Sequence, residues 1–347
     1  MTNYTITGID LAKRIMHLTT VSPVGGIISR KKVKTEDLLE YINSLDKTTL
    51  IAMEACSGSN YWFQEISHYG YKVKLMKTKD VKVYAQSKQK NDFNDALAIC
   101  KAAKDPELKE VRAKNKAEQD VSLLHKARGN AISFRVCKTN SLMSSLYEYG
   151  YLTKLSKKLF VKNCHEEVEQ AYEKGFLSKI AYQVLMEECK EIHILYEREK
   201  FLKKAITRHS KADAKAKKLQ RITGIGPVNA SYLSIAPMET YKTAKDFAAS
   251  LGIVPSQHSS GNKIVLGRIT KQGDRYARTM LVQAGRSIAI QARKKKITAT
   301  SNDPLVVWAK KKFAENKPFN LIAVALANKL ARTAYAIIVN NTQYRSN

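Results

Sequence analysis

The spacing of apolar positions separates a first part of the chain, with short-period alternation, from a longer part with helical spacing. Apolar and polar side chains alternate over residues 4–9 and again over residues 27–33. A period of two predicts half-buried strands. Gly25 and Gly26 stand directly before the second run, where a hairpin turn is expected. We therefore predict an N-terminal strand and a returning strand that follows a hairpin turn.

Strand-like and helical stretches alternate after this hairpin. Residues 36–45 have helical spacing, with Thr35 placed to cap them, and residues 50–53 form a short apolar run typical of a buried strand. The elements expected next are a helix over 61–69, a strand over 71–76 and a helix over 92–104. This order predicts a mixed sheet with helices on its faces, in an α/β domain that we place at residues 1–112.

Residues 113–215 have a different character, because proline and glycine become scarce and Lys, Glu, Leu and Ala dominate. Long helices with apolar positions such as Leu123, Leu124 and Leu146 are expected here. We interpret the segment as an α-helical hairpin or coiled-coil arm. An arm of this kind serves oligomerisation, and its basic face is a candidate contact for nucleic acid.

Residues 216–347 are expected to form a mostly α-helical domain. It begins near Gly224-Ile-Gly226, a turn between two helical stretches. Consecutive backbone N–H groups in such a turn can hold a phosphate, which is the signature of a helix-hairpin-helix element. The alternative interpretation is an ordinary tight interhelical turn.

The charge balance indicates a polyanionic partner. The chain has 60 Lys and Arg against 31 Asp and Glu, a formal charge of +29, and 44% hydrophobic residues. Such a hydrophobic fraction excludes wholesale disorder, and nucleic acid is the commonest partner of so basic a protein. Ribosomal and membrane-surface proteins are equally basic, so charge alone does not decide between them.

The cellular compartment is expected to be the cytoplasm. Residues 1–3 are too short for a secretory leader ahead of the first strand, and the five cysteines are scattered without a CxxC pair. This spacing predicts neither a disulfide framework nor a zinc site. The apolar stretch 321–339 contains Lys329 and Arg332, whose burial in a bilayer would be costly. We therefore expect a packed helix and no membrane partner.

Four carboxylates are candidate metal ligands. Asp10 follows the first predicted strand and Glu54 follows the apolar strand 50–53, while Asp92 and Asp95 are three residues apart on one helix face. Together they supply the oxygen ligands that hard cations require, with Mg²⁺ or Mn²⁺ as the expected cofactor. Each acid alone has a structural alternative: a turn cap at Asp10, a lysine partner at Glu54 and a helix cap at Asp92.

The same acids carry a family resemblance. Residues 8–13, 53–55 and 90–96 resemble the Asp-Glu-Asp-Asp (DEDD) domain of the "one-ten" and "eleven-eleven" insertion-sequence transposases, which is RuvC-like and hence related to ribonuclease H. The C-terminal segments that resemble this family are 222–227, 247–255, 258–263 and 269–273, with Arg278 beyond, and His258-Ser-Ser-Gly261 is similar to the eleven-eleven branch. One departure is Asn91, where threonine is expected. Because this position is not itself an expected ligand, we expect the metal set to stay intact.

The resemblance implies a division of roles. Asp10, Glu54, Asp92 and Asp95 would bind the metal, and a serine would attack a DNA phosphate and hold it covalently. We place that serine at Ser260, before Gly261, with Ser259 as its rival; from the residues alone, Ser-Ser-Gly is equally an ordinary polar loop. An isolated serine hydroxyl needs activation, and the metal site is a better candidate for this than His258. The expected phosphate contacts are Gly224, Gly226, Lys263, Arg268, Lys271, Arg275 and Arg278, each of the cations being alternatively part of a solvated basic face.

The resulting hypothesis is a DNA transposase or site-specific recombinase that excises and inserts a mobile element. The resemblance implies guidance by a structured non-coding RNA that pairs with target and donor DNA. Because recombination needs at least two active sites, we expect a dimer or tetramer, in a bacterial or archaeal cell and associated with the nucleoid. The alternatives are a metal-only, junction-resolving nuclease of RuvC type and a non-catalytic nucleic-acid-binding protein.

Overall fold

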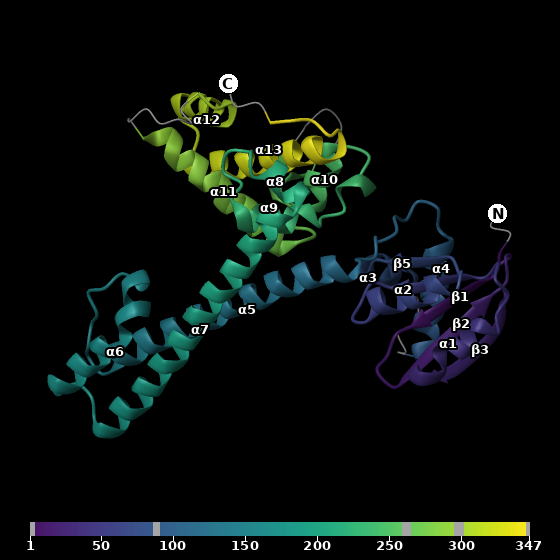
Figure 1. Ribbon diagram of the computed structural model, residues 1–347, viewed down its shortest axis with the longest axis horizontal. Helices are drawn as coiled ribbons and strands as arrows, with labels where there is room; N and C mark the ends of the chain where they lie inside the picture. The colour runs from purple at the N-terminus through teal and green to yellow at the C-terminus, as the bar shows by residue number, and fades with distance from the viewer. Residues whose placement is uncertain (1–3, 86–90, 259–264, 295–301, 345–347) are drawn as a thin grey trace. The chain divides into compact units, whose positions relative to one another are not determined.

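The chain forms two compact units in a computed structural model that describes residues 4–85, 91–258, 265–294 and 302–344 (Figure 1). The units are Met1–Gln119 and Asp120–Asn347. The first is a mixed α/β unit, and the second is mostly helical. The predicted order of an α/β domain followed by helical parts is confirmed at this level. The further division of the helical part at residues 215 and 216 stays a prediction.

A five-stranded mixed sheet forms the first unit. Its strands are β1 (Ile6–Asp10), β2 (Ile15–Val21), β3 (Ile27–Lys34), β4 (Leu50–Glu54) and β5 (Val73–Met76), in the spatial order β3-β2-β1-β4-β5. Strands β1 to β3 form an antiparallel meander, and β4 and β5 are parallel to β1. The sequence predicts all of these strands except β2, which pairs with both β1 and β3.

Helices cover both faces of this sheet. One face packs against α1 (Leu38–Asn43) and α2 (Ser59–His68), and the other against α3 (Thr78–Tyr84) and α4 (Asp92–Lys104). Side chains alternate between the two faces along β1, so that Ile9 lies in the first core and Ile6 in the second. The prediction that Thr35 caps a helix is wrong. Thr35 begins a 3₁₀ turn, Thr35–Asp37, and its hydroxyl has no hydrogen-bond partner among the described residues.

Three helices make the arm-like part of the second unit: α5 (Lys116–Glu148), α6 (Lys157–Glu173) and α7 (Lys179–Ala212), of which α5 starts in the first unit. They enclose a separate small core around Phe160, Leu146 and Ile192. The ion pairs Arg135–Glu199, at 2.8 Å, and Lys138–Glu188, at 2.9 Å, join α5 to α7. Coiled-coil packing of this arm stays a prediction.

The remaining helices share one larger core, which contains Phe247, Leu281 and Leu326. They are α8 (Ala214–Leu219), α9 (Pro227–Ser234), α10 (Ala244–Ser250), α11 (Arg275–Arg293), α12 (Pro304–Ala314) and α13 (Phe319–Val339), with a 3₁₀ turn at Met238–Thr240. A two-stranded hairpin, β6 (Pro255–Gln257) and β7 (Leu266–Ile269), lies between α10 and α11. By length and composition α13 is the one described helix that is apolar enough to cross a membrane, but residues such as Ile322 and Leu330 are buried in this core.

Candidate active site

Two of the predicted acids stand at the carboxyl edge of the sheet. Asp10 ends β1 and Glu54 ends β4, and these strands are parallel neighbours with Ile9 opposite Met53. Alternation along the strands places both acids on the same face as Ile6 and Leu50, which is the face that α4 covers. The sheet therefore directs both carboxylates toward the helix that carries Asp92 and Asp95.

Gly8 sets how closely that helix approaches. A Cβ atom at Gly8 would lie 2.3 Å from the Ala96 carbonyl oxygen and 2.7 Å from Cys100 Sγ. Because glycine has no Cβ, α4 can lie directly against β1. The first turn of α4 then comes beside the end of the strand.

Three carboxylates meet there. The ligand oxygens of Asp10, Asp92 and Asp95 all lie within 4.8 Å of one another, with Asp10 partly buried and the other two exposed. Glu54 is not part of this group, although its charge acts on Asp10. An all-oxygen donor set of this size fits a hard divalent cation such as Mg²⁺.

The electrostatics of the site favour a bound cation. Burial, together with the neighbouring charges of Asp95, Asp92 and Glu54, raises the pKa of Asp10 to about 6. The pKa of the nearby Cys56 thiol is also raised, first by burial and then by Glu54 and Asp10. A divalent cation would relieve this repulsion, so the residues present fit the metal that the sequence predicts.

His17 is a neighbour of the site that the sequence analysis missed. It lies opposite Asp10 in the β1–β2 register, and its Nδ1 is 3.3 Å from Asp92 Oδ2. Its ring meets the Phe93 ring edge-on, at a centroid distance of 5.0 Å. The only sequence signal would have been strand β2 itself, which pairs antiparallel with β1 and was not predicted.

Asn91 fits its position as a helix cap. Its Oδ1 accepts a hydrogen bond of 3.0 Å from the Phe93 backbone N–H, at the start of α4. Asparagine and threonine both serve as N-cap residues. The departure from the expected threonine therefore keeps the cap of the helix that presents Asp92 and Asp95.

The candidate nucleophiles Ser260 and Ser259, with Lys263, lie outside the described residues. The hairpin that flanks them is described: β6 and β7 pair antiparallel, and the His258 N–H donates to the Val265 carbonyl at 2.9 Å. Close backbone packing forms the base of this hairpin. The Lys271 N–H donates to the Gly252 carbonyl at 3.1 Å, and a Cβ at Gly273 would lie 1.8 Å from the Ser250 carbonyl oxygen.

Arg278 takes part in this base. Its Nη1 donates to the backbone carbonyls of Leu251 and Gln272, each at 2.9 Å. The guanidinium thus joins the segment before the hairpin to the segment after it. The other predicted cations here, Arg268, Lys271 and Arg275, are exposed on β7, the following turn and the start of α11.

Known proteins similar to this chain include several transposases. Residues 216–300 match the "Transposase IS116/IS110/IS902 family", and residues 7–150 match a DEDD transposase domain of IS110 type. A "Probable family 20 transposase" of Pseudomonas aeruginosa is 32% identical over 97% of this chain and 98% of its own length. The transposase for insertion sequence element IS1328 of Yersinia enterocolitica is 30% identical over 99% of both chains. The transposase for insertion sequence element IS1111A of Coxiella burnetii is 30% identical over 99% of this chain and 92% of its own length.

The chain belongs to the IS116/IS110/IS902 transposase family. The resemblance drawn from the sequence is therefore confirmed. As a transposase of an insertion sequence, the protein is an enzyme that cuts and joins DNA, and its DEDD-type domain implies use of a divalent metal. Membership argues against the alternative of a non-catalytic binding protein.

The Gly-Ile-Gly turn of the transposase joins α8 to α9. Gly224 has a φ of +88°, and a Cβ there would lie 2.7 Å from Ile288 Cδ1, so the turn needs glycine at this position. A Cβ at Gly226 would meet no atom within 4 Å. The preceding Thr223 donates to the buried carboxylate of Asp303 at 2.7 Å, which fixes the turn to the start of α12. Phosphate binding by this turn stays a prediction.

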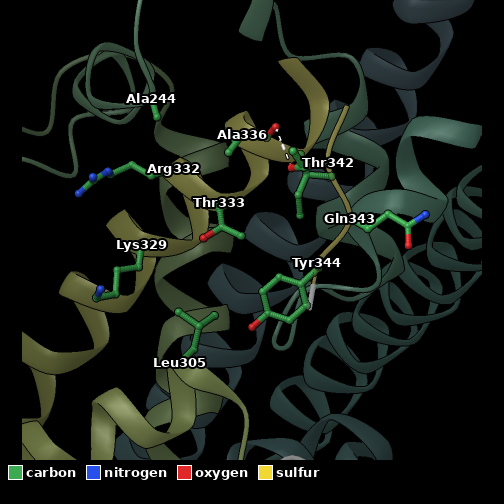
Figure 2. Close-up of a pocket in the computed structure, with 10 residues that line it drawn as sticks. Ala244, Leu305, Lys329, Arg332, Thr333, Ala336, Thr342, Gln343 and Tyr344 are labelled. Atoms are coloured by element: carbon green, nitrogen blue, oxygen red, sulfur yellow. Dashed lines mark hydrogen bonds between the residues drawn. The ribbon is translucent and has the colours of Figure 1, made fainter. Parts of the chain in front are cut away.

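A basic cavity of about 560 Å³ lies on α13 of the transposase (Figure 2). Lys329, Arg332 and Thr333 line it from the helix, and Thr342 to Tyr344 line it from the C-terminal segment. The Lys329 ammonium also lies 4.9 Å from the centroid of the Trp308 ring. None of the described residues that line the cavity is acidic, so it is a basic surface.

Proposed function

We propose that the transposase cuts and rejoins DNA with one or two Mg²⁺ or Mn²⁺ ions held by Asp10, Glu54, Asp92 and Asp95. The observation that carries this proposal is the meeting of Asp10, Asp92 and Asp95 within 4.8 Å at the carboxyl edge of the sheet. A bound divalent ion supplies stabilisation of the negative charge that develops on a reacting phosphate. The protein contributes by fixing the carboxylates in advance through the β1–α4 contact at Gly8.

Ser260 is the proposed nucleophile, with Ser259 as the alternative. In the step proposed, the serine oxygen forms a bond to the DNA phosphorus while the bond from phosphorus to the adjoining sugar oxygen breaks. The proton lost by the serine is balanced by the proton that the leaving sugar oxygen gains. The covalent phosphodiester keeps the bond energy, so a second sugar hydroxyl can displace the serine and rejoin the strand.

The proposed nucleic-acid contacts lie in the second unit: Gly224, Gly226, Lys263, Arg268, Lys271, Arg275 and Arg278. The exposure of Arg268, Lys271 and Arg275 supports contact with phosphate. Arg278 Nη1 donates to two backbone carbonyls at the base of the hairpin. We therefore propose that Arg278 both contacts phosphate and supports the hairpin.

A structured RNA of the mobile element is the proposed guide, and the proposed assembly is a dimer or tetramer located in the cytoplasm at the nucleoid. The arm supports the assembly, because large apolar side chains stand exposed on its helices, among them Leu123, Phe134, Ile180 and Phe201. Sequencing the RNA that co-purifies with the protein tests the guide. One abundant structured RNA encoded beside the gene supports it, and random RNA on an active protein contradicts it.

The serine is tested with a DNA substrate whose leaving strand is too short to stay bound, so that a covalent intermediate accumulates. The wild-type protein is expected to yield a protein–DNA adduct that resists denaturation. Ser260→Ala removes the adduct and Ser259→Ala keeps it, with the reverse result identifying Ser259. Strand cleavage that survives in the double variant would instead favour the metal-only nuclease of RuvC type.

A further inference from the structure

A basic and aromatic groove lies in the first unit, away from the acids on α4. It has a volume of about 660 Å³. The residues that give it its character are Lys13, Arg14, Lys34, Thr35, Tyr61 and Trp62. They come from the turn after β1, the end of β3 and the start of α2. None of these residues belongs to the metal site or to the proposed phosphate contacts.

The groove and the acids share the same edge of the sheet. Lys13 follows Asp10 by three residues and Tyr61 follows Glu54 by seven. Three residues of extended chain span at most about 11 Å. One strand of a DNA duplex rises about 3.4 Å per nucleotide and an unpaired strand is more extended, so the Lys13 backbone is within about three nucleotides of the Asp10 backbone. The acids face α4 whereas the groove lies on the α1 and α2 side, and Leu11 and Ala12 connect Asp10 to Lys13 and Arg14 of the groove.

The side chains of the groove suit a nucleotide strand. Among the described residues, three cations line it against one acid, Glu36, whose Oε1 is 3.5 Å from Lys34 Nζ. Tyr61 is 52% exposed and meets the Trp62 ring edge-on, at a centroid distance of 5.0 Å. Trp62 is half-buried. Accessible aromatic rings beside cations are the combination that stacks bases and holds phosphates in single-strand binding sites.

We propose that this groove binds the unpaired DNA strand next to the phosphate that is cut, with a base stacked on Tyr61 and Trp62 and the backbone on Lys13 and Arg14. This proposal rests on the proposed function in one respect, namely that DNA is cut at the edge of the sheet where Asp10 ends β1. A strand that leaves the acids around this edge enters the groove within a few nucleotides. This proximity favours the cut DNA strand over guide RNA as the occupant.

Intrinsic fluorescence provides the test, because Trp62 and Trp308 are the only tryptophans of the chain. In the full-length Trp308→Phe variant, Trp62 is the sole reporter. Titration in EDTA, without cleavage, is expected to show quenching by single-stranded DNA and little quenching by an abasic strand of equal length. Equal quenching by both strands, or stronger quenching by RNA of the same sequence, overturns the proposal.

A cross-linking measurement covers the case in which Trp308→Phe does not fold. Wild-type protein in EDTA is irradiated with single-stranded DNA that carries 5-bromouracil, and the cross-linked peptide is identified by mass spectrometry. The expected cross-link is at Tyr61 or Trp62. Cross-links confined to the second unit contradict the proposal.

Substitutions complete the test. Tyr61→Ala is expected to weaken single-stranded DNA binding by roughly 10-fold, and Lys13→Ala with Arg14→Ala to weaken it further at low salt. Tyr69→Ala is the matched control, since Tyr69 is 41% exposed at the opposite end of α2. If Tyr61→Ala and Tyr69→Ala bind alike, the groove is not the site. Failure of the proposed function is distinguished by Asp10→Asn, which tests cleavage while leaving this binding measurement in place.

Discussion

At the scale of single residues, Asp10 has the property that most affects the candidate site, namely a raised pKa. Burial and the charges of Asp95, Asp92 and Glu54 raise its pKa from the ordinary value of 3.8 to about 6. The folded chain therefore binds a proton at Asp10 more tightly than the unfolded chain does. Without metal, the stability that this group contributes is full below about pH 4 and is lost as the pH rises through about 6. A bound cation reverses the preference, because it needs the carboxylate.

Replacing Asp10 therefore has opposite effects on stability and on activity. We expect Asp10→Asn to raise the free energy of unfolding at pH 8 in EDTA by about 1 kcal/mol, allowing for solvent screening of a half-exposed group. The wild type is expected to gain melting temperature with Mg²⁺, and the variant to lose both this gain and strand cleavage. Thermal unfolding at pH 5 and pH 8, with and without Mg²⁺, checks this. A destabilised Asp10→Asn protein at pH 8 in EDTA would contradict the electrostatic account.

His17 Nδ1 is 3.3 Å from Asp92 Oδ2, and this contact is expected to orient Asp92, a proposed metal ligand. Groups that orient a metal ligand typically contribute 10- to 100-fold to affinity. We expect His17→Ala to weaken Mn²⁺ binding by roughly 10-fold in titration calorimetry, and His17→Gln to recover part of the loss. His68→Ala, at the exposed end of α2, is the control. Unchanged Mn²⁺ affinity in His17→Ala would show that Asp92 is held without it.

At the scale of elements, the β6–β7 hairpin depends on close packing of two backbone segments at its base; the candidate serines come between its two strands in the sequence. Gly273 has a φ of +71° and no room for a Cβ beside Ser250. Gly273→Ala should therefore cost more than the ~1–3 kcal/mol of a left-handed residue alone. Gly175→Ala is the matched control, because Gly175 has a φ of +77° and nothing within 4 Å of its Cβ. Chemical denaturation of both variants measures the difference, and equal losses would mean that the contact with Ser250 relaxes freely.

His125 lies where the arm meets the C-terminal helices, again at the scale of elements. Its Nδ1 is 3.0 Å from the Tyr276 hydroxyl and its Nε2 is 3.2 Å from Ser231 Oγ, and burial, followed by Arg128 and His209, lowers its pKa to about 4. Stability from the neutral ring is present above about pH 6.5 and is lost as the pH falls toward 4.

We expect the second unit to lose thermal stability between pH 7 and pH 5, and His125→Gln to flatten this dependence while lowering the stability at pH 7. Circular dichroism melts across this pH range provide the measurement. A wild-type melting temperature that is flat from pH 7 to pH 5 would exclude His125 as the acid-sensitive group.

The sequence predicted the elements that local patterns specify. Helix α4 begins and ends where its spacing indicates, and the acids at the ends of β1 and β4 could be located because strand ends follow from short apolar runs. What the sequence did not predict depends on contacts between distant residues. The partnership of His17 with Asp92 needs the register of β2, and the role of Gly8 needs the approach of α4. The anchoring of Arg278 to Leu251 and Gln272 equally has no local signal.

Charge is the property of the whole molecule that bears most directly on its partners. Even if each of the 31 acids paired with one cation, 60 − 31 = 29 cations would remain to meet solvent or phosphate. Neutralising phosphates releases counterions, so the logarithm of the binding constant should fall linearly with the logarithm of the salt concentration. Asp92 and Asp95, which are exposed in the candidate metal site, are expected to work against this attraction until a cation binds.

Binding of DNA by the whole transposase should therefore depend steeply on salt and improve with metal. With about 6–10 phosphates neutralised, affinity in fluorescence anisotropy should fall about 10³- to 10⁵-fold between ~50 and ~200 mM salt. Replacing Ca²⁺ by EDTA should weaken binding in the wild type more than in Asp92→Asn with Asp95→Asn, because the variant lacks the local repulsion. A weak dependence of affinity on salt would mean that the excess positive charge serves solubility. An equal effect of Ca²⁺ on DNA binding in both proteins would mean that the cation acts at a site other than the Asp10, Asp92 and Asp95 cluster.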